Sequence, residues 1–139
     1  MTSGLVVHAS VSGGWFIGDE ASPLTDAALS AVVRSGATVP VLWSYEMANL
    51  LVLAERRGRI SRQDVVRVHE ALAALPISFD EPSAARGLPS LTRLARDHGL
   101  TAYDAAYLEL AQRRGSELAT RDSALREAAR RAGVPVFEA

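Results

Sequence analysis

The sequence predicts an α/β domain in which helices cover both faces of a central, mainly parallel β-sheet, as a three-layer α/β/α sandwich. Short apolar runs alternate with longer segments of helical period along almost the whole chain. Strands joined by such helices run parallel and are covered on both faces. With 139 residues, the chain is long enough to bury a hydrophobic core. We therefore expect a single domain over residues 1–139.

The expected elements follow one another along the chain. The pair Ser22-Pro23 opens a helix with proline at its first position, a helix over Ser44–Arg57 is capped by Ser44, and Ser61 with Asp64 forms a capping box. The segment Phe79–Pro89, with two prolines and a glycine, predicts an irregular loop or short turn. Glycines that end helices are Gly58, Gly99, Gly115 and Gly133. Strands are expected at Leu5–Val7, Thr38–Trp43, Pro76–Phe79, Glu117–Thr120 and Val134–Phe137.

The composition excludes several classes of protein. There is no cysteine, so neither a disulfide framework nor a thiolate metal site is available. No apolar run approaches the roughly 20 residues that span a bilayer, and no signal peptide is recognisable, so we expect a cytoplasmic protein without a membrane partner. The net charge is −1, yet all 15 basic residues are arginine. Coding bias explains this, as does the fit of guanidinium groups to phosphate.

Three acidic residues stand where a predicted strand gives way to a helix. They are Glu46, Asp104 and Asp122. Ligands of parallel sheets bind beyond the carboxyl ends of the strands, so these carboxylates are expected to meet in one pocket. Each also has a structural explanation: Asp104 completes a capping box, Asp122 is an N-cap, and Glu46 complements a helix dipole. His8 follows the first strand, where a fourth acid would complete the set.

Clustered carboxylates favour a bound cation. Like charges within a few ångströms raise one another's pKa unless a proton or metal intervenes. Mg²⁺ or Mn²⁺ prefers oxygen ligands and retains waters, which suits phosphodiester hydrolysis by an activated water. The sequence therefore predicts a metal-dependent hydrolase of a phosphodiester.

Four motifs resemble those of PIN-domain ribonucleases, specifically the VapC-type toxins of bacterial toxin–antitoxin systems. They are VVHASV, SYEMANLL after VPVLW, LTAYDAAYLELA and LATRDSAL, and they cover nearly the whole chain in the order of that family. The resemblance implies a PIN-like fold and a metal-dependent endoribonuclease. Its expected substrate is single-stranded or loop RNA, because duplex RNA enters a shallow cleft poorly. It also implies a homodimer, inhibited by a cognate, VapB-like antitoxin protein.

The same resemblance assigns the site residues. Glu46, Asp104 and Asp122 match the catalytic acids, and the Mg²⁺ or Mn²⁺ ligands map onto Asp104, Asp122 and the position of His8. Asn49 and Thr120 match polar positions near the site, with a structural hydrogen-bonding role as the alternative. Ser10 is a candidate for orienting water or ligand.

His8 departs from the family pattern, which has aspartate at this position. Neutral imidazole binds Mn²⁺, Zn²⁺ or Co²⁺ better than Mg²⁺, so metal preference and activity are affected. Three explanations stay open: a variant with altered metal preference, a weakened or inactive enzyme, and an engineered substitution that makes a toxic protein producible. A hydrogen-bonded structural histidine is the fourth possibility.

Two other functions compete with the nuclease. One is a non-catalytic PIN-like module that binds an antitoxin-type partner, supported by the missing acid. The other is a phospho-receiver domain, which the absence of lysine disfavours. Trp15 and Tyr103 are candidates for stacking a base, or belong to the core. The helix with Tyr107 and Leu110 is a candidate dimer interface.

Overall fold

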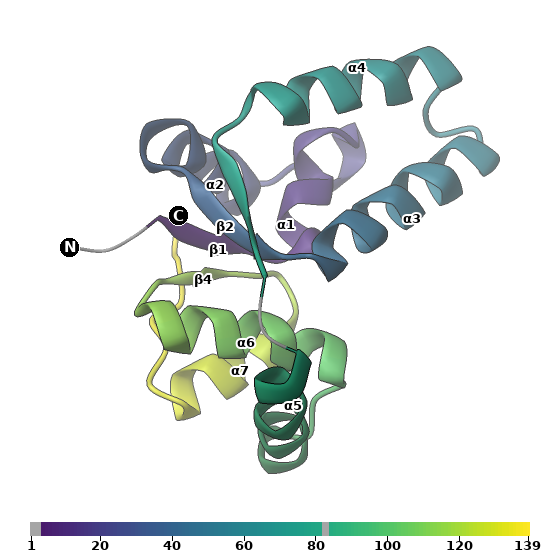
Figure 1. Ribbon diagram of the computed structural model, residues 1–139. Helices are drawn as coiled ribbons and strands as arrows, with labels where there is room; N and C mark the ends of the chain where they lie inside the picture. Colours follow the sequence, from purple (N-terminus) through teal and green to yellow (C-terminus); the bar gives the residue numbers. More distant parts are fainter. Residues whose placement is uncertain (1–3, 82–83) are drawn as a thin grey trace.

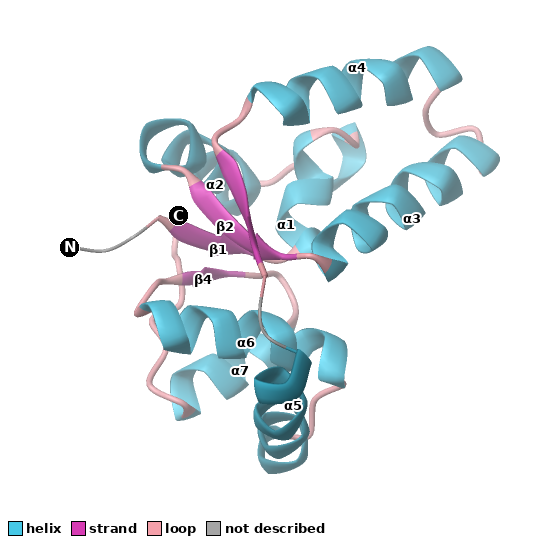
Figure 2. Ribbon diagram, viewed as in Figure 1, coloured by secondary structure: helices cyan, strands magenta, loops and turns pink. Residues whose placement is uncertain are grey.

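The protein folds around a four-stranded parallel sheet with the strand order β3-β2-β1-β4. The computed structural model describes residues 4–81 and 84–139. Helices cover both sides of the sheet (Figures 1 and 2), so the predicted three-layer α/β/α architecture is confirmed. In chain order the elements are β1 Leu5–Val7, α1 Ala9–Ser12, the 3-10 turns Gly13–Trp15 and Gly18–Glu20, α2 Pro23–Ser35, β2 Ala37–Pro40, α3 Leu42–Arg56, α4 Arg62–Ala74, β3 Ile77–Asp80, α5 Ala84–His98, α6 Ala102–Arg114, β4 Leu118–Ala119 and α7 Ser123–Arg131.

The two faces of the sheet are covered by different helices. Leu5 and Val7 of β1 pack on one face against the buried apolar residues of α1 and α2. Val6 points to the other face, where its cluster includes residues of α3, α5, α6 and α7. Both faces of β1 are therefore buried, because successive side chains of a strand point to opposite sides. Figure 1 shows α3 and α4 extending from the sheet as an antiparallel pair.

Most helix boundaries lie where their capping residues predict. Ser22 and Ser61 form reciprocal capping boxes with Thr25 and Asp64, and Pro23 is the first residue of α2. The glycines at 58, 99, 115 and 133 all have positive φ angles. That conformation costs glycine little, so it ends helices readily.

The start of α3 differs from the prediction. The expected strand Thr38–Trp43 ends at Pro40, and α3 begins at Leu42, two residues before the expected cap Ser44. Val41 occupies the N-cap without a side-chain hydrogen bond. Trp43 begins the buried stripe of α3, which continues through Met47, Leu51 and Ala54 at helical spacing. A short apolar run does not distinguish a strand from a buried helix.

Two further predictions were wrong in part. Most of the expected loop Phe79–Pro89 is regular, because β3 extends to Asp80 and α5 begins at Ala84; residues 82 and 83 lie outside the described part of the chain. Pro89 lies within α5, where it costs the helix one backbone hydrogen bond. The expected strand Val134–Phe137 is reduced to an isolated bridge between Val136 and Leu118.

The structure also places four aromatic or apolar candidates. Tyr107 and Leu110 are buried in the core, so these two side chains are not on the surface of α6, the helix expected to form a dimer interface. Trp15 is half-buried, and its indole N–H donates to the Thr25 carbonyl at 2.9 Å. Tyr103, in contrast, is 67% exposed and is not part of the core.

Candidate active site

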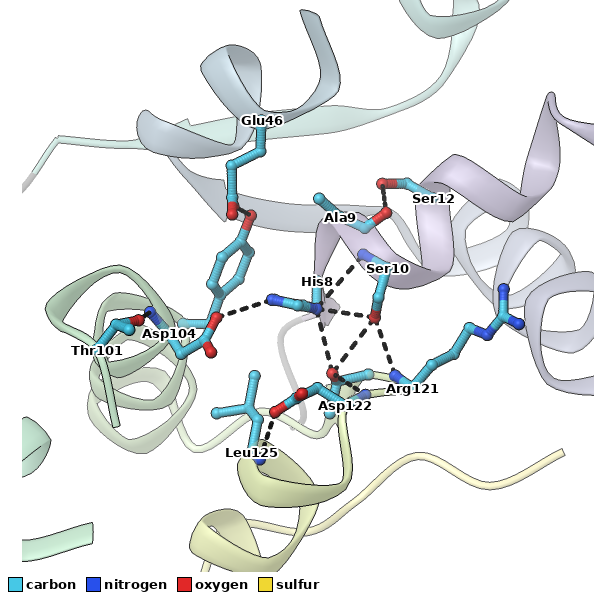
Figure 3. A network of polar contacts seen from close by, with 12 residues as sticks. His8, Ala9, Ser10, Ser12, Glu46, Thr101, Asp104, Arg121, Asp122 and Leu125 are labelled. Atoms are coloured by element: carbon cyan, nitrogen blue, oxygen red, sulfur yellow. Dashed lines mark hydrogen bonds and ion pairs between the residues drawn. The ribbon is translucent and has the colours of Figure 1, made fainter. Parts of the chain in front are cut away.

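His8 lies at the carboxyl end of β1 and contacts Asp104 directly. The His8 Nε2 atom is 3.0 Å from Asp104 Oδ1 (Figure 3). On the other side of the ring, Nδ1 caps α1 by accepting from the Ser10 amide at 3.3 Å. An Nδ1 atom that accepts from an amide carries no proton, so the proton of the neutral ring is on Nε2 and is donated to Asp104. His8 is only 8% exposed, and Tyr107 packs edge-on against its ring with centroids 4.7 Å apart.

The two aspartates lie at the starts of α6 and α7. Asp104 follows the helix α5, so its predicted place at a strand-to-helix junction was wrong. Thr101 caps α6 by accepting from the Asp104 amide at 3.1 Å, while the Asp104 carboxylate contacts His8 instead of returning to the Thr101 amide. Asp122 is itself the N-cap of α7, where its Oδ2 accepts from the Leu125 amide at 2.8 Å. Asp122 therefore has the capping role, and Oδ1 of its carboxylate accepts no hydrogen bond from the described residues.

Glu46 is held by a buried tyrosine. The Tyr107 hydroxyl donates to Glu46 Oε1 at 2.5 Å. Burial, and then the hydrogen bond and charge of Glu46, raise the pKa of Tyr107 above its ordinary value, so the hydroxyl remains a donor. Because α3 begins at Leu42, Glu46 lies beyond the first helical turn, and the dipole explanation for this residue was wrong. Tyr107 orients Glu46 instead.

Ser10 and Thr120 connect the end of β1 to the end of β4. Ser10 Oγ lies 2.8 Å from His8 Nδ1 and accepts from the Arg121 amide at 2.9 Å. Thr120 Oγ1 lies 3.2 Å from His8 Nδ1 and accepts from the Asp122 amide at 3.1 Å. Both hydroxyls thus belong to the hydrogen-bond network around His8 (Figure 3). The last expected residue, Asn49, lies apart from this network, beside Glu46 in a groove of the surface.

Carboxylates with free oxygens remain at this edge of the sheet. No group of three or more His, Cys, Asp or Glu side chains in the described ranges is arranged to hold a metal ion. The donor chemistry still fits Mg²⁺, because this ion is commonly held by one or two carboxylates together with waters and substrate phosphates. Asp104 and Asp122 supply such a pair. His8 offers no free lone pair in this arrangement, since Nε2 donates to Asp104 and Nδ1 accepts from Ser10.

Two polar side chains with buried partners or positions, Tyr107 and Asp80, were not predicted from the sequence as functional candidates. Tyr107 follows Asp104 by one helical turn, and that spacing could have placed it on the same face of α6. Asp80, at the carboxyl end of β3, is buried and receives two hydrogen bonds from Arg113, at 3.1 and 2.6 Å. The Glu109 and Asp80 carboxylates raise the pKa of Arg113. This acid at a strand end is therefore already neutralised by an arginine.

The fold and this acidic edge together define the class of protein. It is a parallel α/β domain in which His8 and Asp122 lie between a strand and a helix, Glu46 lies on α3 and Asp104 lies in the first turn of α6. Residues 6–131 match the model of the PIN domain family, and the chain belongs to that family.

Relatives and solved structures support the assignment. Ribonuclease VapC3 of Pyrobaculum aerophilum is 33% identical over 123 residues, which are 88% of this chain and 92% of that protein. The crystal structure of PAE2754 from Pyrobaculum aerophilum matches with a TM-score of 0.67 and 25% identity, over 92% of this chain and 87% of that one. The crystal structure of FitAcB from Neisseria gonorrhoeae, with a TM-score of 0.66, 17% identity and 96% coverage of both chains, shares the fold. In the described ranges, no helix is long and apolar enough to cross a membrane.

Proposed function

We propose that this protein is a metal-dependent endoribonuclease, the toxin of a toxin–antitoxin pair, with its activity weakened by His8. The observation that supports the proposal is the contact of His8 with Asp104 in a member of the PIN domain family, with Asp122 and the Tyr107-bound Glu46 nearby in Figure 3. The name of its relative, Ribonuclease VapC3, supports RNA as the substrate. The whole chain acts as one domain, a homodimer inhibited by a VapB-like antitoxin.

Each residue of the edge has a role in this proposal. Asp104 and Asp122 would hold Mg²⁺ or Mn²⁺, which supplies a Lewis acid for the scissile phosphate and acidifies a bound water. Glu46 keeps one oxygen on Tyr107, and its second oxygen orients the attacking water or accepts its proton. Ser10 and Thr120 fix the ring of His8 and the backbone before Asp122. His8 occupies one oxygen of Asp104, which lowers the affinity of the site for the ion.

The test is cleavage of a labelled, partly structured RNA in Mg²⁺ and in Mn²⁺. The parent chain is compared with His8→Asp and with His8→Asp combined with Asp104→Asn. We expect His8→Asp to cut faster than the parent and the double variant to be inactive. Glu70→Gln, which neutralises an exposed carboxylate on α4, is the matched control and should leave cleavage unchanged. Equal cleavage by His8→Asp and its Asp104→Asn derivative would refute the proposed site.

One contact favours a second function. The His8 ring has protein partners on both nitrogens, so this residue offers no ligand atom at the position of the expected acid. A non-catalytic module that only binds an antitoxin-type partner is consistent with that arrangement. In this case neither the parent nor His8→Asp cleaves RNA in either metal, while both bind the same protein partner.

A further inference from the structure

An unexplained groove adjoins the candidate active site. It has a volume of about 350 Å³ and is lined by Leu42, Tyr45, Glu46, Asn49 and Tyr103. Four of these residues belong to α3, and Tyr45 and Glu46 are each three or four positions from both Leu42 and Asn49, so the four lie along one face of that helix. Tyr103 comes from the first turn of α6. The groove therefore lies between the two helices that carry Glu46 and Asp104.

Two exposed tyrosines distinguish this groove from ordinary surface. The side chain of Tyr45 is 74% exposed and that of Tyr103 is 67% exposed. Each directly precedes a candidate site acid, Glu46 or Asp104, so each ring is tied to the position of that acid. Aromatic rings held in the open beside a polar site are the usual platform for stacking a nucleobase.

The charges of the groove indicate which part of a nucleic acid it takes. Among the described residues that line it, Glu46 carries the only charge, and that charge is negative. A phosphate would be repelled there, whereas an uncharged base is not. Asn49 adds an amide that both donates and accepts, as the edge of a base requires. The base would thus bind in the groove, and the scissile phosphate would bind next to it, at the carboxylates of the sheet edge.

We propose that Tyr45 and Tyr103 form a subsite that stacks a nucleobase of single-stranded RNA next to the bond to be cleaved. This inference rests on the proposed function for its substrate, and it adds the place where a base is held. Stacking on an aromatic ring is tolerant of sequence, so the tyrosines contribute affinity, and Asn49 provides what base preference the subsite has.

The test measures RNA binding apart from cleavage. All proteins carry Asp104→Asn, so that RNA is not cut, and a fluorescent hexauridylate is titrated in Mg²⁺ by anisotropy. An abasic ribose-phosphate hexamer of the same length is the second probe. We expect Tyr45→Ala and Tyr103→Ala each to weaken hexauridylate binding by about 5- to 150-fold and to leave the abasic probe unaffected. Tyr45→Phe and Tyr103→Phe should bind like the parent, because they keep the ring.

Controls separate this inference from its alternatives. Val66→Ala truncates an exposed apolar side chain on α4 and should change nothing. Three results would overturn the inference. They are unchanged hexauridylate binding in both alanine variants, an equal loss of binding for the abasic probe, and no hexauridylate binding by the Asp104→Asn protein with both tyrosines present. Loss of self-association in sedimentation, with RNA binding intact, would instead make the groove an interface between copies. If RNA binding depends on the tyrosines but His8→Asp does not cleave RNA, the subsite is supported and the proposed nuclease function is refuted.

Discussion

Replacing His8 by aspartate tests the electrostatics of the site through protein stability. In the parent, the His8 ring donates to the Asp104 carboxylate at 3.0 Å. The variant loses this hydrogen bond, worth about 1.5–3 kcal/mol with a charged partner. It also places two carboxylates near each other, which costs roughly 3 kcal/mol at 5 Å in an effective dielectric of about 20. The Asp104 side chain is 26% exposed, so solvent screens part of this repulsion. With about half of the repulsion screened, we expect a total loss of about 3–5 kcal/mol.

The assay is urea unfolding in EDTA and in excess magnesium chloride. Metal that binds only the folded state contributes about 2.7 kcal/mol at a hundred times its Kd, so Mg²⁺ should restore most of the stability of His8→Asp. The parent should gain much less, because the ion competes with the bond from His8 to Asp104. His8→Asn, which removes the ring without adding charge, is the matched control. If His8→Asp is as stable as His8→Asn in EDTA, the two carboxylates do not face each other and the argument fails.

Other contacts give predictions for the stability of the fold. The raised pKa of Tyr107 stabilises the folded state below pH 10, and this contribution falls above it by about 1.4 kcal/mol per pH unit, because the folded state holds the proton more tightly. The chain has no lysine or cysteine to titrate in that range, so the free energy of unfolding of Tyr107→Phe, measured in urea, should depend less on pH above pH 10. An unchanged slope would contradict the burial and hydrogen bonding of the Tyr107 hydroxyl. Asp80→Asn should cost about 1–3 kcal/mol in urea unfolding, since it removes the charged partner of Arg113; no loss would mean the pair is solvent-screened. Ser22→Ala should lower the free energy of unfolding, measured by thermal denaturation, by about 1 kcal/mol because the cap of α2 is lost; an equal loss in Ser22→Gly would contradict this explanation.

Much of the architecture could be predicted because its signals are local. The capping boxes at Ser22 and Ser61 involve residues three positions apart, and they begin α2 and α4 as expected. The start of α3 was predicted wrongly because apolar residues continue from β2 into the helix without a turn signal. The bridge at Val136 shows the same limit, since an apolar run does not say how many of its residues find a partner strand.

The sequence by itself determined the parallel α/β class of the fold and the place of Asp122 between β4 and α7, whereas Asp104 follows the helix α5 and Glu46 lies within α3. Only the tertiary structure decided which atoms meet there. His8 and Asp104 are 96 residues apart in the chain, and Glu46 and Tyr107 are 61 apart. Such partners depend on the strand order β3-β2-β1-β4, which sets helices distant in sequence side by side. Caps depend on hydrogen bonds within one turn, whereas the pairing of side chains depends on how whole layers pack.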